Sequence, residues 1–419
     1  MRISEIKEAI GSLKLSGLYR DEAAARKRLA ALSDAFLAKY GERDGAMLLS
    51  TPGRSEICGN HTDHNKGTAI AAAIDRDIIA IAARRADGVI RVQSEGRRED
   101  RLTVEAAVSA DNFPRYKSIA LIAGVVGGFI KGGYKVGGFD AYTATEVLSG
   151  SGLSSSAAFE VMIGNILNHL YNGGKIDNTE IAKIAQYAEN EYFGKPSGLL
   201  DQMAAAVGGF VYMDFGADEP IVEPIDFSLA DAGYRLAIVG TGGSHSDLNE
   251  DYASIPREMR EVAAALGKEN MREVGAAELW AAIPRLHGVL PDRALLRAIH
   301  FVRECERVDK MHSAIIAGDM AEVLRLHRES GHSSFEYLQN VYTTKHNDQG
   351  LSLAIAVADS FIYGKGASVR VHGGGFAGTI QVLVPEGEAE ALSGAMDAVF
   401  GKGACMLLSV RAAGAVRLL

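Results

Sequence analysis

The apolar positions of the chain recur with the period of a helix in some segments and with the period of a strand in others. Helical patterns occur at residues 1–42, 117–131, 157–170, 181–193 and 292–326. Alternating or short apolar runs predict strands at residues 46–50, 68–82, 89–93, 101–105, 139–145, 210–215 and 234–239. Helices and strands are interleaved, and this pattern predicts an α/β or α+β fold in two domains.

A glycine- and serine-rich segment follows the predicted strand 139–145. Gly150 and Gly152 permit a tight turn, three serines follow at residues 154–156, and a helical run opens at Ala157. A strand, a glycine loop and a helix N-terminus together present backbone N–H groups to an anion. Helix capping would explain one serine but not three behind two glycines. The segment lacks the Gly-Lys-Ser/Thr of a Walker A loop, so we predict a phosphate-binding loop of another type.

Residues 51–67 are dense in charged and hydrogen-bonding side chains, directly before the apolar run 68–82. An ordinary polar loop would have this composition, because Asn, Asp, His and Gly are turn formers. A binding site at the edge of a buried strand would have it too. The residues alone leave both interpretations open.

Composition limits the classes of function. The chain has 419 residues, which suits two domains, and a net charge of −9, which argues against nucleic-acid or anionic-membrane partners. Cys58, Cys305 and Cys405 are few and far apart, as in proteins of a reducing compartment. The charged first residues lack a signal-peptide core, and no uncharged run could span a bilayer. We expect a cytoplasmic protein.

Three motifs resemble those of galactokinases, members of the GHMP small-molecule kinase superfamily. Residues 152–157 read Gly-Leu-Ser-Ser-Ser-Ala, as in the second motif of that family. Residues 53–67 are similar to the family sequence Gly-Arg-Val-Asn-Leu-Ile-Gly-Glu-His-Thr-Asp-Tyr-Asn-x-Gly. Residues 373–378 are similar to its third, glycine-rich motif. Three motifs in the family order extend the resemblance over about residues 45–385.

The resemblance implies an ATP-dependent sugar kinase and a set of site residues. Asp201 of the Asp-Gln pair would be catalytic, although its place in the first turn of a helix would also suit the helix dipole. Arg54 would lie beside the transferred phosphoryl group. Ser156 and Glu189 would hold Mg²⁺. The implied sugar contacts are Asn60, His61, Asp63, Gly198 and Tyr252. The implied ATP contacts are Gly150, Ser151, Gly152, Leu153, Ser154, Ser155, Ser156 and Ala157.

The family also implies a two-domain α+β fold, with a mixed-sheet N-terminal domain, an α+β C-terminal domain and the active site in the cleft between them. We place the boundary so that the domains span residues 1–213 and 214–419. The implied ligands are ATP, Mg²⁺ and a small-molecule sugar, with no nucleic acid and no membrane, in a monomer or weak homo-oligomer.

Two departures from the family sequence bear on the substrate. Asn60 stands where the family has a Glu that contacts the sugar near its C6 oxygen, and His64 stands where it has a Tyr. An amide can bond a hydroxyl and can also donate to a carboxylate. Galactose is therefore the leading expectation, with galacturonate and L-arabinose as alternatives. A non-catalytic sugar sensor, or a kinase of another GHMP substrate such as homoserine or mevalonate, agrees less well with the retained residues.

Overall fold

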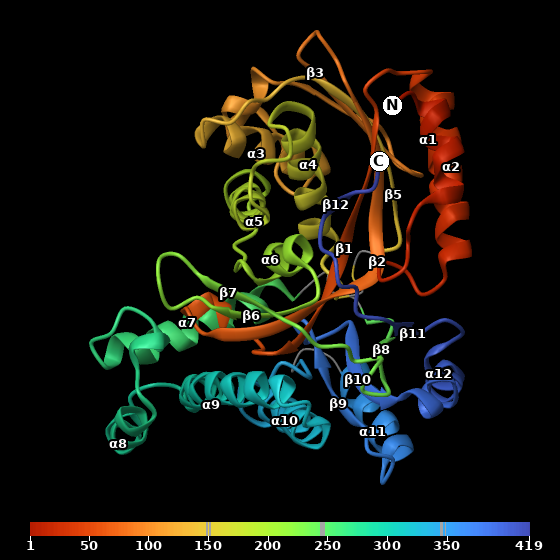
Figure 1. Cartoon of the computed structure of the whole chain (residues 1–419). Coiled ribbons are helices and arrows are strands. Elements are labelled where there is room, and N and C mark those ends of the chain that lie inside the picture. Colours follow the sequence, from red (N-terminus) through yellow and green to blue (C-terminus); the bar gives the residue numbers. More distant parts are fainter. Residues whose placement is uncertain (148–149, 151, 244–247, 344–346, 348) are drawn as a thin grey trace.

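The computed structural model describes residues 1–147, 150, 152–243, 248–343, 347 and 349–419 of the chain, which folds around two sheets (Figure 1). The first sheet has the strand order β12-β1-β2-β5-β3-β4, and β6 and β7 extend it from the first half of β2. Only the β3–β5 pairing is parallel among the described pairs. Its strands are β1 (Met47–Cys58), β2 (Thr68–Arg84), β3 (Val89–Ser94), β4 (Asp100–Thr103), β5 (Phe139–Thr145), β6 (Phe210–Asp214), β7 (Ile221–Ile225) and β12 (Val416–Arg417).

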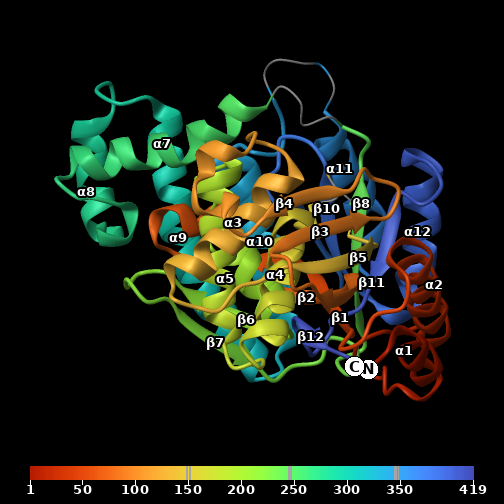
Figure 2. The ribbon, with the colours of Figure 1, turned by 90° about the horizontal axis from the view of Figure 1, so that it is seen from above.

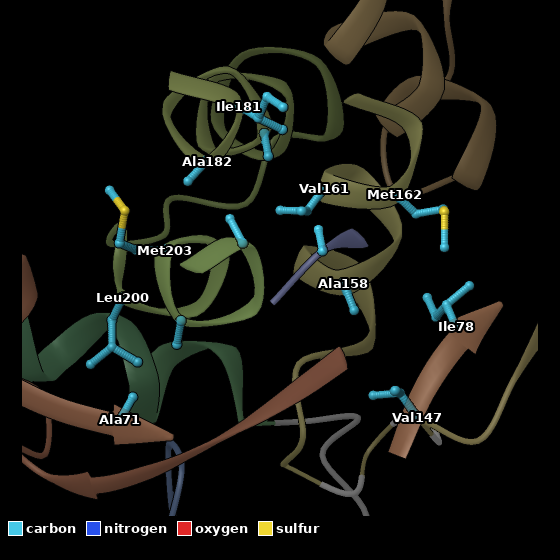
Figure 3. Close-up of a cluster of buried hydrophobic side chains, with 14 of the residues drawn as sticks. Ala71, Ile78, Val147, Ala158, Val161, Met162, Ile181, Ala182, Leu200 and Met203 are labelled. Carbon is cyan, nitrogen blue, oxygen red and sulfur yellow. The ribbon is translucent and has the colours of Figure 1, made fainter. Parts of the chain in front are cut away.

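Helices cover both faces of this sheet, and Figure 1 shows the two groups on opposite sides. One group is α1 (Ile3–Ala9) and α2 (Glu22–Tyr40). The other is α3 (Ser118–Lys131), α4 (Ser155–Tyr171), α5 (Asn178–Tyr187) and α6 (Leu200–Val207). The labelled side chains of Figure 3 show apolar residues of α4, α5 and α6 gathered with residues of β2 in one core.

The two-sided cover explains why β2 is an almost continuous apolar run. Successive side chains of a strand point to opposite faces. From Ile78 to Ala82, every second residue packs with the α3–α6 group, whereas the alternate residues from Ile79 to Ala83 pack with α1 and α2. In a strand that is buried on both faces, the positions on both faces are apolar, so polar and apolar residues do not alternate.

The N-terminal helices are also fixed by a buried polar cluster around Asp77. The Asp77 carboxylate accepts hydrogen bonds from Tyr19, from Ser50, from Arg28 at 3.0 Å and from Arg411 at 3.3 Å. A buried carboxylate needs such partners, because removing an unpaired charge from water is costly. The helices at residues 1–42 therefore form part of the structural core around the first sheet.

The second sheet is antiparallel, in the order β11-β8-β10-β9. Its strands are β8 (Tyr234–Gly240), β9 (Ser368–His372), β10 (Thr379–Pro385) and β11 (Cys405–Leu408). The helices α11 (Gly350–Ile362) and α12 (Glu386–Phe400) share one apolar core with this sheet. A third core joins α7 (Asn249–Ala265), α8 (Ala276–Leu286) and α9 (Asp292–Ile316), and Figure 2 shows α7 and α8 at one end of the molecule.

The single helix predicted over residues 292–326 is wrong in one respect, because the chain breaks there into α9 and α10 (Met320–Ser333). Gly318 has a φ of +67°, and Asp319 caps the new helix by accepting from the backbone N–H of Glu322 at 3.0 Å. Glycine in the left-handed region followed by an Asp cap is a usual way to end one helix and start the next.

The predicted strand 46–50 is too short, since β1 runs on to Cys58 and so takes Arg54 and Glu56 out of the expected polar loop. Both side chains are buried and paired with opposite charges, Arg54 with Asp201 and Glu56 with Arg370 at 2.7 Å. Local sequence suggests a polar turn, but these distant partners allow charged residues inside a buried strand.

The mixed α+β fold is confirmed, and the strand at residues 139–145 and the helix ending at residue 131 lie where they are predicted. The strand β7 follows the proposed domain boundary yet pairs with β6, and β12 pairs with β1. The division into residues 1–213 and 214–419 stays a prediction. No described helix combines the length and the apolar character that a bilayer crossing requires.

Candidate active site

Arg54 and Asp201 form the centre of the site, although 146 residues separate them in sequence. Arg54 projects from β1, and Asp201 lies in the first turn of α6. The Nε and Nη2 atoms of Arg54 lie 2.7 and 2.6 Å from Oδ1 of Asp201. An arginine held in this way offers a fixed positive charge beside a carboxylate, an arrangement suited to an anionic group in transfer.

Gly152, Leu153 and Ser154 of the glycine loop contact the same pair. Nη1 of Arg54 donates to the carbonyl of Gly152 at 2.5 Å, and the backbone N–H of Arg54 donates to the carbonyl of Leu153 at 3.2 Å. The Oγ atom of Ser154 donates to Oδ2 of Asp201. Ser154 thus contacts the catalytic candidate in this structure.

The backbone at the start of α4 is unusual. Ser154 has a φ of +60°, the left-handed region that a non-glycine residue seldom adopts. The helix begins at Ser155, two residues before the predicted start, and the buried Ala157 lies in its first turn. The strained residue directs its hydroxyl to Asp201 while the helix N-terminus remains at the loop, the place where a phosphate would bind.

The two glycine-rich loops pack against each other. A side chain at Gly152 would meet Oγ1 of Thr379 at 2.7 Å and Nδ1 of His372 at 2.8 Å. Gly152 has a φ of +72°, so both its conformation and its surroundings require glycine. The loop of the first sheet therefore touches β9 and β10 of the second, and the site lies where the two sheets meet.

Burial raises the pKa of Asp201, but the charge of Arg54 and the hydrogen bonds from Arg54 and Ser154 outweigh it and hold this pKa below its ordinary value. Asp201 is then ionised and is a weak base. Phosphoryl transfer through a loose transition state needs little early removal of the hydroxyl proton, so a weak but well-placed acceptor is sufficient.

A second carboxylate, Glu189, contacts the first turn of α4. It sits on a π-helical turn, Ala188–Phe193, that continues α5. Its Oε1 accepts from Oγ of Ser156 at 2.9 Å and from Nζ of Lys195 at 3.1 Å, and its Oε2 accepts from Nε2 of Gln202 at 2.8 Å. Gln202 also bonds Glu160, whose pKa burial raises well above the usual range.

The oxygen pair of Ser156 and Glu189 fits a Mg²⁺ ion, which prefers hard oxygen ligands and usually takes one or two from protein and the rest from phosphates and water. Within the described part of the chain, no group of three or more His, Cys, Asp or Glu side chains could hold a metal without a substrate.

Two of the predicted sugar contacts, Asp63 and Gly198, lie side by side. Gly198 lies so close that a Cβ atom there would come 1.8 Å from Oδ2 of Asp63. The backbone N–H of His64 donates to Oδ1 of Asp63 at 2.9 Å. Asn190 holds the Gly198 segment in place, since its Oδ1 accepts from the backbone N–H of Ser197 at 2.7 Å.

His61 and Tyr252 reach the loop at residues 373–378 of the second sheet. Nε2 of His61 lies 2.9 Å from the carbonyl of Gly374, so this nitrogen carries the proton. Burial, followed by the charge of neighbouring His64, lowers the pKa of His61 to about 3. The Tyr252 hydroxyl donates to the carbonyl of Gly375 at 2.8 Å. Phe376 takes the left-handed conformation in this loop, with a φ of +57°.

Asn60 is placed differently from its neighbours. Its side chain is buried, and its Nδ2 donates to Glu56 at 3.1 Å and to the carbonyl of Gly373 at 2.8 Å. Its Oδ1 accepts from Nδ2 of Asn340 at 2.7 Å. The carboxamide of Asn60 is thus engaged with protein groups on both sides and presents no spare donor to a ligand here.

The structure brings most of the predicted residues together in one region. Ser151, Ser244 and His245 lie outside the described residues. Lys195 and Asn340 were missed by the sequence analysis. The sequence around Lys195, Gly-Lys-Pro-Ser-Gly, did contain a signal, because a lysine between two glycines directly before the Asp-Gln pair is a candidate phosphate ligand.

The chain is similar to known proteins over most of its length. A galactokinase galactose-binding signature matches residues 34–84, and the GHMP kinases N terminal domain matches residues 120–209. A galactokinase from Streptomyces coelicolor is 32% identical over 92% of this chain and 98% of its own length. One from Limosilactobacillus reuteri is 29% identical over 85% and 91%.

Solved structures share the fold. The galactokinase of Lactococcus lactis, complexed with galactose, superposes with a TM-score of 0.79 at 22% identity and covers 93% of this chain and 100% of its own. A mevalonate kinase superposes with a TM-score of 0.61 at 14% identity, over 87% of this chain and 99% of its own. With its motifs, its fold and its relatives in agreement, the chain belongs to the galactokinase family of GHMP kinases.

Proposed function

We propose that this protein is an ATP-dependent sugar 1-kinase that transfers the γ-phosphoryl group of ATP to the anomeric hydroxyl of galactose. The observation that carries the proposal is the Arg54–Asp201 ion pair. Arg54 donates to the Gly152 carbonyl of the glycine loop, and Asp201 accepts from Ser154, the residue before α4. Two relatives named galactokinase align with 92% and 83% of the chain.

The triphosphate would bind at the loop of residues 150–157 and the N-terminus of α4, where backbone N–H groups and the helix dipole favour an anion. Ser156 and Glu189 would hold Mg²⁺, which neutralises charge on the phosphates when bound. Arg54 would face the phosphoryl group in transfer, since its guanidinium is fixed by Asp201 and by Gly152.

Asp201 would receive the proton of the sugar hydroxyl as the bond from its oxygen to phosphorus forms. Its low pKa keeps it ionised and ready to accept. Asp63 would orient the ring hydroxyls, with Gly198 as the small residue that makes room for its carboxylate. His61 and Tyr252 would close the same pocket from the side of the second sheet.

A second candidate substrate is a sugar of the same configuration without the C6 group, such as L-arabinose. The observation that favours it is the buried Asn60, whose amide hydrogens and oxygen already have protein partners. A hydroxyl at C6 would find no free acceptor at this residue. A carboxylate at C6, as in galacturonate, would find no free donor there either.

The test is ADP release by the purified protein with Mg·ATP and a panel of sugars: galactose, galacturonate, N-acetylgalactosamine, L-arabinose and glucose. The highest kcat/KM with galactose would support the proposal. The highest value with L-arabinose would identify the second candidate. Binding of a sugar by calorimetry without any turnover would reject the kinase function and indicate a sensor.

A further inference from the structure

Lys195 lies beside the proposed nucleotide site and has no role in the mechanism above. Its backbone N–H donates to the carbonyl of Glu189 at 3.1 Å, which fixes the start of its side chain. Its Nζ lies 3.1 Å from Oε1 of the same residue. The charges of Asp201 and Glu160 also act on it. The ammonium group is thus held among the acidic residues next to the glycine loop.

The oxygen that Lys195 contacts is the one proposed for Mg²⁺. Oε1 of Glu189 accepts hydrogen bonds from the Ser156 hydroxyl and the Lys195 ammonium group, whereas Oε2 accepts one from the Gln202 amide. Glu189 is buried and requires a positive neighbour. A metal ion bound between Ser156 and Glu189 would supply that charge, and it would leave no room for an ammonium group on the same oxygen.

Protein atoms do not enclose the Lys195 side chain, since 55% of it is exposed, so the side chain has room to turn away from Glu189. A lysine head group is a compact charge with three donors on a flexible stem of four carbons. When the metal takes Oε1 of Glu189, the nearest large negative charge is the triphosphate at the N-terminus of α4.

We propose that Lys195 is a phosphate-binding residue, which pairs with Glu189 in the nucleotide-free protein and turns to the triphosphate when Mg·ATP binds. This inference rests on the proposed function, since it requires a nucleotide at the glycine loop. It predicts that the charge of Lys195 contributes to nucleotide affinity at magnesium concentrations that saturate the metal site.

The experiment is calorimetric titration of the full-length protein with the non-hydrolysable analogue Mg·AMP-PNP at saturating magnesium, without sugar. Lys195→Met should bind the analogue about 10- to 100-fold more weakly, the effect expected for loss of one charged hydrogen bond. Lys195→Arg should stay within about fivefold of the wild type, because it retains the charge. The exposed Lys175 provides the matched control, and Lys175→Met should bind like the wild type.

Equal or tighter binding by Lys195→Met would overturn the proposal, since it would mean that the lysine only competes with the metal for Glu189. The same comparison in a Glu189→Gln background separates direct phosphate binding by Lys195 from an effect through Glu189. If Lys195→Met has no added effect there, the lysine acts only through Glu189 and the proposal is wrong. If the wild type binds the analogue but phosphorylates no sugar, the proposed function is wrong. The proposal for Lys195 is still tested in that case, because the affinities of the variants for the analogue can be compared.

Discussion

Replacement of Gly198 by alanine should disable the sugar side of the site while leaving the nucleotide side intact. Gly198 does not have a positive φ, so its backbone accepts alanine without strain. The added Cβ would lie 1.8 Å from Oδ2 and 2.4 Å from Cγ of Asp63. Ordinary contacts begin near 3.4 Å, and so the carboxylate would have to retreat by roughly 1.5 Å.

The Gly198 segment itself cannot easily move instead. Asn190 bonds both the backbone N–H and the hydroxyl of Ser197, and Gln186 donates to the Ser197 carbonyl at 3.0 Å. If Asp63 positions ring hydroxyls, its displacement removes a charged hydrogen bond of about 1.5–3 kcal/mol, equivalent to a loss of about 10- to 100-fold in kcat/KM for the sugar. The KM for ATP should change by less than about twofold, because Asp63 makes no described contact with the glycine loop.

The assay is sugar-dependent ADP release at varied sugar and at varied ATP, with thermal melting to show that the variant is folded. Gly394→Ala on α12 is the matched control, since nothing lies within 4 Å of the added atom, and its kinetics should equal those of the wild type. If Gly198→Ala melts near the wild-type temperature and keeps the wild-type kcat/KM for the sugar, Asp63 does not bind the substrate as proposed. Asp63→Ala provides the same test should Gly198→Ala fail to fold.

Three further outcomes are expected. Asp201→Asn should lower kcat by about 100-fold or more with little change in the KM for the sugar, and near-normal turnover would exclude a proton acceptor at this position. Glu189→Gln should raise the magnesium concentration for half-maximal activity by about tenfold, whereas Glu191→Gln, an exposed neighbour on the same turn, should not. Burial lowers the pKa of His327 to about 3 in the folded protein, whereas its ordinary value is 6.5. Between these two pH values the histidine is protonated in the unfolded chain but not in the folded one. The free energy of unfolding should therefore fall by about 1.4 kcal/mol for this histidine between pH 7.5 and 5.5. In urea titrations, His327→Asn should show a shallower fall, and parallel curves would refute this assignment.

Local patterns in the sequence predicted the parts of the site that short segments define. The strand at residues 139–145, the glycine turn and the helix behind it follow from periodicity and from the conformations that glycine allows. The family resemblance placed Arg54 beside the transferred phosphoryl group and made Asp201 the catalytic residue, which implies that the two side chains lie close together.

Long-range partners account for what the sequence did not predict. Arg54 and Glu56 can continue a buried strand only because Asp201 and Arg370 meet them from positions 147 and 314 residues further along the chain. Asn60 was expected to face the sugar, but Glu56, Gly373 and Asn340 surround its carboxamide. No local rule indicates such contacts. Lys195 differs, since its place between two glycines is a local signal, but only the structure shows that it contacts Glu189.

The most direct measurement is ³¹P NMR of the products that the purified protein forms from Mg·ATP and galactose, with Asp201→Asn run in parallel. We predict that the wild type transfers the γ-phosphoryl group of ATP to the oxygen on the anomeric carbon, and that Asp201→Asn forms this product about 100-fold or more slowly. A signal of inorganic phosphate alone, a phosphate on another hydroxyl, or equal rates for the two proteins would contradict this prediction.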